Sequence, residues 1–163
     1  MLTTREKYSA GVGMVEVLVA LVVIGVGMLG IASLYVTTLQ AKTSSQSRMQ
    51  AVTLANDMAD RIRANRLAPS ADFVVTQTAA MSAPTPVCTT SATTAPSSTC
   101  TADQMAAYDL YLWDQALRAT LPGTVTETIT AAGSFPTTYT IKISWTEALT
   151  GASSLNYTLQ VQI

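Results

Sequence analysis

The sequence predicts an α+β fold in which one long N-terminal helix packs on a small antiparallel β-sheet, with one extra helix and a disulfide loop. Three observations support this prediction. Residues 17–36 form an uncharged, apolar run of twenty residues, about the length of a membrane-spanning helix. Residues 37–66 contain no proline or glycine and carry apolar residues at helical spacing. Residues 124–163 contain segments that alternate apolar and polar side chains, as strands with one buried face do.

The first half of the long helix follows a short leader, residues 1–11, that holds Arg5 and Lys7. These cations predict a cytoplasmic N-terminus, because positive residues flank membrane helices on the cytoplasmic side. Between leader and run lies a single acid, Glu16, and a carboxylate deep in a membrane costs roughly 2.5–3.5 kcal/mol. A secretory signal peptide would have a shorter apolar region. A plain membrane anchor fits the length but gives Glu16 no role.

Cleavage of the chain after Gly11 would give Glu16 a role. Gly11 has no side chain, so a protease can approach its backbone closely. The cut creates a new amine on Val12, four residues before Glu16, and residues four apart share one face of a helix. The new positive charge and the acid can then neutralise each other, or pair with groups on neighbouring chains.

The second half of the helix should run to about Asn65, because Pro69 bars its continuation. Apolar residues recur there at steps of three and four and form one stripe. Asp57 precedes Arg61 by four residues, which is the favourable orientation for an ion pair. The predicted stripe consists of Met49, Val52, Ala55, Ala59 and Ile62, widened by Leu54 and Met58.

Residues 69–102 are predicted to be an exposed loop. Eleven of the twenty-two residues from 80 to 101 are Ser or Thr, and three are proline. This segment holds the two cysteines of the chain, Cys88 and Cys100, and an even pair in an exported domain predicts a disulfide. The alternative, a zinc or redox pair, would need further ligands or a two-residue spacing.

A second helix is predicted to begin at Asp103 as its N-cap and to end at Leu121, before a proline and a glycine. Three acids of this segment are five or six residues apart, on different faces, so they form neither a carboxylate pair nor a calcium loop. They are predicted to be solvated, whereas both tryptophans are predicted to lie in the core. These residues are Asp103, Asp109, Asp114, Trp113 and Trp145.

Three strands joined in sequence are predicted over residues 124–130, 139–145 and 155–163, with turns at 133–136 and 150–153. They should form an antiparallel meander with one buried face. The apolar stripe of the long helix is the expected cover for that face. Residues in one phase of the three strands are Val125, Glu127, Ile129, Tyr139, Ile141, Ile143, Trp145, Tyr157, Leu159, Val161 and Ile163.

Composition argues against several classes of function. The net charge is −1 and the chain has no histidine, which excludes histidine-based metal sites and Ser-His or Cys-His catalytic pairs. There is no glycine-rich phosphate loop, so we expect no enzyme activity, no cofactor and no metal. The one basic cluster, Arg61, Arg63 and Arg66, is interpreted as a solvated face or a contact with acids of a next subunit. We expect no nucleic-acid partner.

The stretch Gly11-Val12-Gly13-Met14-Val15-Glu16 resembles the type IV prepilin signature, a glycine followed by Phe-Thr-Leu-Ile-Glu. Gly11 matches the residue before the cut, Val12 the N-methylated residue and Glu16 the glutamate of the mature chain. Val12 and Gly13 depart from the usual phenylalanine and threonine or serine. The following residues, EVLVALVVIGVGMLG, resemble the PilV group of minor pilins and also minor pseudopilins of type II secretion.

This resemblance implies a pilin-like fold divided into a cleaved leader (1–11), a transmembrane and assembly helix (12–36), an amphipathic continuation (37–67) and a periplasmic globular domain (68–163). It implies a minor pilin, processed by prepilin peptidase, that primes or caps pilus assembly and supports pilus biogenesis and twitching motility. The implied partners are other minor pilins, the major pilin, the prepilin peptidase, the inner-membrane assembly platform and, before assembly, membrane lipid. The implied location is the inner membrane, with the C-terminal domain periplasmic, and then the pilus. A minor pseudopilin and a tip adhesin that uses the Ser/Thr-rich loop remain as alternatives.

Overall fold

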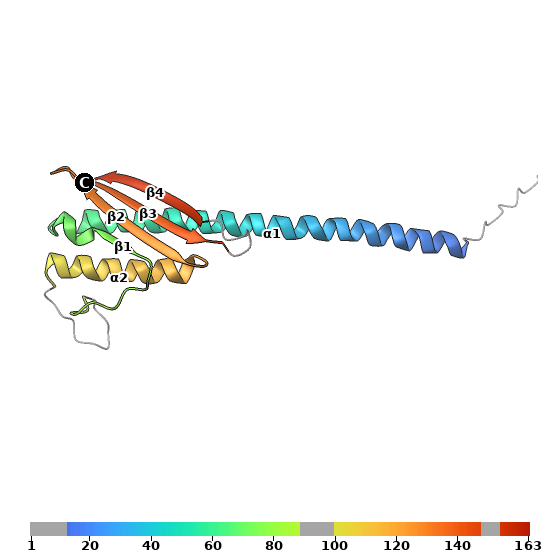
Figure 1. Cartoon of the computed structure of the whole chain (residues 1–163), viewed down its shortest axis with the longest axis horizontal. Helices are drawn as coiled ribbons and strands as arrows, with labels where there is room; N and C mark the ends of the chain where they lie inside the picture. Colours follow the sequence, from blue (N-terminus) through green and yellow to red (C-terminus); the bar gives the residue numbers. More distant parts are fainter. Residues whose placement is uncertain (1–12, 89–99, 148–153) are drawn as a thin grey trace, which may run out of the picture. The chain divides into compact units, whose positions relative to one another are not determined.

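A computed structural model describes residues 13–88, 100–147 and 154–163. The chain divides after Lys42 into two compact units, Met1–Lys42 and Thr43–Ile163. The elements are α1 (Met14–Ala64), η1 (Ser70–Phe73), β1 (Val75–Gln77), α2 (Ala102–Thr120), β2 (Val125–Ala132), β3 (Thr138–Thr146) and β4 (Ser154–Gln162); Figure 1 labels the helices and strands. A long N-terminal helix, a small antiparallel sheet, a second helix and a disulfide make up a pilin-like α+β fold, as the sequence predicted.

The long helix α1 ends at Ala64, close to the predicted end at about Asn65. In the first unit its large apolar side chains are exposed over residues 14–39. In the second unit it buries one narrow face, made of Ser47, Ala51, Ala55, Met58, Ala59 and Ile62. The predicted stripe was therefore wrong in part, because Met49 is 70% exposed and Val52 is 37% exposed.

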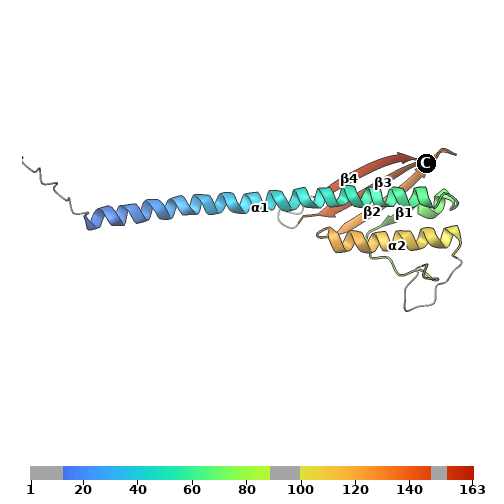
Figure 2. The same ribbon diagram turned by 180° about the vertical axis from the view of Figure 1, so that it is seen from behind.

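Small side chains explain why the buried face of α1 differs from the predicted stripe. Ser47 and Ala51 leave room for neighbouring elements to approach the helix closely, and the Ser47 hydroxyl donates a hydrogen bond to the Thr43 carbonyl at 3.1 Å. The indole Nε1 of Trp113 donates to the Leu54 carbonyl at 2.9 Å. α2 thus lies directly beside α1 in the second unit, as Figures 1 and 2 both show.

The sheet has four strands in the order β1-β2-β3-β4, and all neighbours are antiparallel. The predicted meander of three strands is confirmed as β2, β3 and β4. The turn predicted at residues 133–136 lies between β2 and β3, where Gly133 has a φ of 87°, a value that glycine adopts without a steric cost. The turn predicted at 150–153 lies outside the described residues.

One core joins the sheet, α2 and the second half of α1, as expected for a sheet that needs a cover. Both tryptophans are 1% exposed, which confirms their predicted place in the core. The buried apolar residues are Ala51, Ala55, Met58, Ala59, Ile62, Ala68, Phe73, Ala106, Leu110, Trp113, Leu117, Leu121, Val125, Ile129, Tyr139, Ile141, Ile143 and Trp145.

The prediction of one continuous loop over residues 69–102 was wrong at its start. Residues 70–77 form η1 and then β1, which pairs with β2 from Val75 opposite Ile129 to Gln77 opposite Glu127. Phe73 is 1% exposed and packs edge-on against Tyr139, with ring centroids 6.5 Å apart. A strand of three residues is too short for a period-two pattern to be recognised, so only its packing partners define it.

Candidate functional site

Glu16 lies in the first turn of α1 and is exposed. Its backbone N–H donates to the Gly13 carbonyl at 2.9 Å, so the acid stands where the positive end of the helix dipole favours a negative charge. Gly11 and Val12, the predicted cleavage and methylation residues, lie outside the described residues.

The apolar surface that follows Glu16 is wholly exposed within its unit. α1 is the one helix among the described residues that is long and apolar enough to cross a membrane, by length and composition. The large apolar side chains from Leu18 to Val36 are between 53% and 73% exposed. An apolar helix surface of this length requires lipid or other apolar helices around it.

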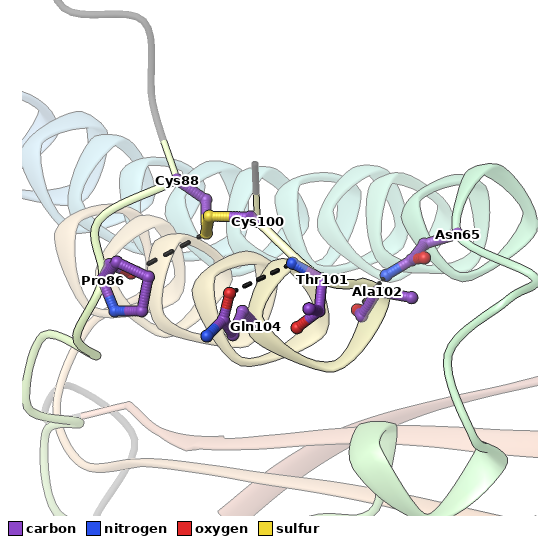
Figure 3. The surroundings of a disulfide bond; sticks show 7 residues. All are labelled: Asn65, Pro86, Cys88, Cys100, Thr101, Ala102 and Gln104. Carbon is purple, nitrogen blue, oxygen red and sulfur yellow. Dashed lines mark hydrogen bonds between the residues drawn. A yellow bond between two sulfur atoms is a disulfide. The ribbon is translucent and has the colours of Figure 1, made fainter. Parts of the chain in front are cut away.

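The predicted disulfide is confirmed: Cys88 and Cys100 are bonded, with their Cα atoms 5.9 Å apart. It closes the Ser/Thr-rich loop directly before α2, as Figure 3 shows. The start of α2 is tied to the end of α1, because the Asn65 amide donates to the Ala102 carbonyl at 2.7 Å. Cys88 and Cys100 are therefore joined next to the place where α2 is tied to α1; residues 89–99 lie outside the described part.

Thr101, and not Asp103, is the N-cap of α2. The Thr101 N–H donates to the Gln104 side chain at 3.0 Å, which forms half of a capping box. Asp103 lies in the first turn, and its hydrogen bond to Thr101 is the main cause that lowers the pKa of its carboxyl. The predicted N-cap was wrong because an acid in the first turn is also favoured by the helix dipole.

Two of the three acids predicted to be solvated are not. Asp109 accepts a hydrogen bond from Arg61 at 2.8 Å, and Arg61 also pairs with Asp57 at 2.9 Å, as its spacing predicted. Arg61 therefore bridges α1 and α2 within the second unit. Asp114 is fully buried. Its charge is compensated by Arg118, in a cluster that was not predicted.

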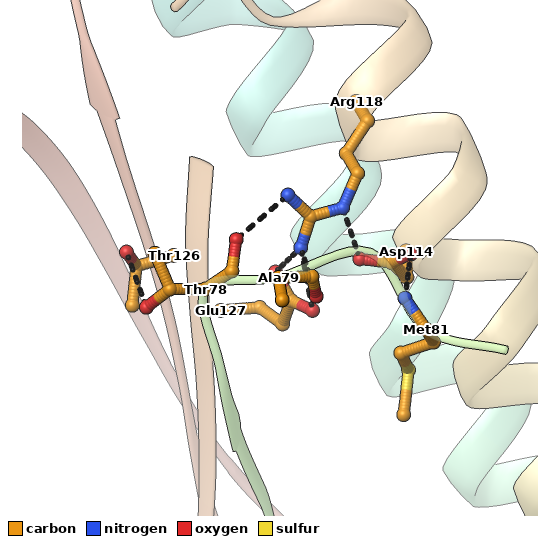
Figure 4. Close-up of polar contacts among 7 residues, drawn as sticks. All are labelled: Thr78, Ala79, Met81, Asp114, Arg118, Thr126 and Glu127. Carbon is orange, nitrogen blue, oxygen red and sulfur yellow. Dashed lines mark hydrogen bonds and ion pairs between the residues drawn. The ribbon is translucent and has the colours of Figure 1, made fainter. Parts of the chain in front are cut away.

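This Arg118 cluster consists of Asp114, Arg118 and Glu127 with the backbone of residues 78–81 (Figure 4). Arg118 donates to Asp114 at 2.6 Å and lies 3.4 Å from Glu127. It also donates to the carbonyls of Thr78 and Ala79 at 2.9 and 2.8 Å. The Met81 N–H donates to Asp114 at 2.9 Å. The cluster thus fixes the chain between β1 and the disulfide loop onto α2 and β2.

Glu127 is fully buried at the base of the Arg118 cluster. Burial, a hydrogen bond with Asp114 and the negative charge of Asp114 raise the pKa of Glu127 from 4.5 to about 8, although Arg118 opposes the shift. Glu127 is therefore mostly protonated at neutral pH and neutral in the core. The sequence held a signal for this cluster, because Glu127 alternates in phase with Val125 and Ile129, and Asp114 precedes Arg118 by four residues.

Among the described residues, no group of three or more Cys, Asp or Glu side chains is placed to hold a metal ion. The Arg118 cluster has a guanidinium and two carboxyl groups; both carboxyl groups are fully buried, and the partly exposed guanidinium is engaged by them and by the backbone carbonyls of Thr78 and Ala79. Its geometry fits a structural role. The features left for function are the apolar surface of α1 with Glu16, the disulfide loop and the outer surfaces of the domain.

Fold and candidate site together define a class of protein: one with a long helix whose apolar surface is exposed and a small α+β domain that holds a disulfide. A family model described as Type IV pilin Tt1218 (Tt1218-like) matches residues 33–111. No curated protein and no solved structure matches the chain. The matched residues begin after Glu16, so the match is independent of the leader signature. It supports a type IV pilin-like family, whose members are structural subunits.

Proposed function

We propose that this chain is a minor pilin of a type IV pilus, processed after Gly11 and methylated on Val12. The observation that supports this proposal most directly is the exposed, uncharged surface of α1 behind a single acid, Glu16. The match to a type IV pilin family model adds independent support. In this proposal the subunit waits in the inner membrane and is then drawn into a filament that it primes or caps.

Glu16 acts in this transfer as the counter-charge of an amine. In the membrane the acid lies near the interface, where water reaches it and the cost is moderate. In a filament core, packed by apolar helices, an unpaired carboxylate is costly, so it requires a cation. The resemblance to pilins implies that this cation is the N-terminal amine of an adjacent subunit, and methylation leaves its positive charge in place.

The mature chain is expected to begin at Val12 with a methylated amine. Peptide mass spectrometry of the membrane-extracted protein measures this directly, and a Gly11→Leu variant serves as the uncleaved control, because a bulky side chain hinders approach to the backbone. A mature chain that begins at any other residue would contradict the proposed processing.

Glu16→Gln and Glu16→Ala are both expected to reduce surface filaments about tenfold or more, the effect of losing at least ~1.4 kcal/mol of pairing. Cleavage, membrane insertion and folding of the domain should remain normal. The measurement counts filaments and assays protein secretion in strains that carry only the variant. Normal filament numbers with both variants would remove the pairing role from Glu16.

The same strains separate the minor pilin from a type II secretion pseudopilin, because the two share the chemistry of the N-terminal helix. A loss of secretion with normal filaments would assign the chain to secretion. A tip adhesin is the second alternative, for which the specific observation is the disulfide that joins the two ends of the Ser/Thr-rich segment beside the start of α2. Deletion of residues 89–99 would then abolish attachment and leave filament numbers unchanged.

A further inference from the structure

β4 forms one edge of the sheet, and among the described residues it is hydrogen-bonded to β3 alone. In Figures 1 and 2 it is the outermost strand of the sheet. The opposite edge is β1, which has three residues against nine in β4. The chain that follows β1 is held by the Arg118 cluster. The two edges of the sheet therefore differ in how much backbone they expose.

The register of β3 and β4 shows which backbone groups of β4 are unpaired. Thr137 and Ile163 exchange two hydrogen bonds, at 2.8 and 2.9 Å. In an antiparallel pair, such residues alternate with residues whose N–H and C=O point away from the partner strand. Since the register continues without interruption to Thr146 opposite Ser154, the residues that direct both groups to the free edge are Ser154, Asn156, Thr158, Gln160 and Gln162.

This edge lacks the usual features that prevent strand addition. Proteins protect exposed edges with charged residues, prolines, bulges or short strands. β4 has nine residues with no charge and no proline, and its register with β3 contains no bulge. A long, regular, uncharged edge is a template for pairing with another chain.

The core beneath this edge is incompletely covered. The inward residues of β3, Tyr139, Ile141, Ile143 and Trp145, are at most 5% exposed. The inward residues of β4 are only half-buried although they pack against the same core; they are Leu155, Tyr157, Leu159, Val161 and Ile163. A further strand would cover the apolar surface that they leave open.

We propose that the free edge of β4 binds an extended segment of a different protein chain, which adds to the sheet as a fifth strand. Backbone N–H and C=O groups on alternate residues are satisfied by an extended chain, because the interior of a helix has no free backbone groups to offer. The inward side chains of β4 are apolar and those on its other face are polar and uncharged. A complementary added strand would therefore alternate apolar and uncharged polar residues. This inference goes beyond the proposed function, since it names a binding surface in the domain.

A second copy of this chain fits the edge less well than a different protein. Head-to-tail pairing would place β4 against β1, which has only three residues and is followed by a segment fixed to α2. Antiparallel pairing of two β4 strands would reverse the packed half of α1, residues 43–64, in one copy. Under the proposed function the subunits of one filament point in the same direction, so this arrangement suits them poorly.

The test removes one N–H from the free edge without breaking the β3 ladder. Thr158→Pro deletes a donor that points outward and places its ring toward an incoming strand, a substitution that edge strands tolerate. Thr158→Ala is the matched control, because it keeps the N–H. Asn156→Lys is a second variant that adds an edge charge with the backbone unchanged. Tryptophan fluorescence checks that each variant folds.

Binding is measured with a photo-crosslinking residue at Gln160 of the full-length chain, in cells that assemble it. Lys142 carries the same probe as a control, because it is exposed on β3, one strand further from the edge. We expect crosslinks from 160 and not from 142. Thr158→Pro and Asn156→Lys should lower them about tenfold, and Thr158→Ala should leave them within about twofold.

The crosslinked peptide, identified by mass spectrometry, decides the nature of the partner. An uncharged alternating segment of another protein, lost in both edge variants, supports the proposal. A crosslink to a second copy of this chain, to a helical segment, or one insensitive to both edge variants would overturn it. Absence of any crosslink from 160 in assembled protein would overturn it as well, and would leave the expected effects at Glu16 unchanged.

Discussion

Arg118→Met is expected to lower the free energy of unfolding of the domain by about 3–5 kcal/mol, the loss typical of a broken buried ion pair. The substitution keeps much of the side-chain volume but leaves Asp114 fully buried without its 2.6 Å partner. It also removes the donors to the Thr78 and Ala79 carbonyls. Urea unfolding in detergent measures the change, followed by fluorescence of Trp113 and Trp145, which both lie in this unit.

Arg63→Met is the matched control for this expectation. Arg63 pairs with Asp60 at 2.7 Å, but their side chains are 45% and 73% exposed. Exposed pairs contribute at most about 1 kcal/mol, so this variant should unfold close to wild type. Equal losses in the two variants would show that the Arg118 cluster does not hold the domain together.

Glu127→Gln is expected to stabilise the domain at neutral pH and to remove part of its pH dependence. The folded state raises the pKa of Glu127 to about 8, from 4.5. Below pH 4.5 the carboxyl is protonated in both states, and the full stability is present. Between these two values the unfolded chain releases the proton while the folded one keeps it, so stability falls as pH rises, by at most about 1.4 kcal/mol per pH unit. Above the folded pKa this loss is complete.

Glutamine keeps the shape of the side chain and an amide donor for Asp114, but it has no proton to release. Wild type and Glu127→Gln should therefore be equally stable near pH 4, and the variant should be more stable by on the order of 2 kcal/mol near pH 7. Urea unfolding at several pH values measures the difference. A difference that does not change with pH would show that Glu127 is ionised in the folded state.

The features that sequence alone determined are those with a local cause. A run of twenty uncharged, apolar residues has the length of a membrane helix and needs lipid or apolar neighbours around it, so the first half of α1 was predictable. Strict alternation in β3 fixed which side chains, such as Ile141 and Trp145, face the core, because successive strand residues point to opposite faces. A single pair of cysteines allowed one intramolecular disulfide, between Cys88 and Cys100. Glu16 was singled out because it interrupts an otherwise uncharged stretch.

Only the tertiary structure decided which polar groups lie in the core and which face of α1 is buried. Asp114 and Glu127 are buried because α2, β2 and the chain after β1 converge on Arg118. A prediction from hydrophobic periodicity places large apolar residues such as Met49 on the buried face, whereas close packing between elements favours small residues there. Those choices depend on contacts between segments far apart in sequence; the inward phase of Glu127 and the spacing of Asp114 and Arg118 were local signals, but they did not identify the partners.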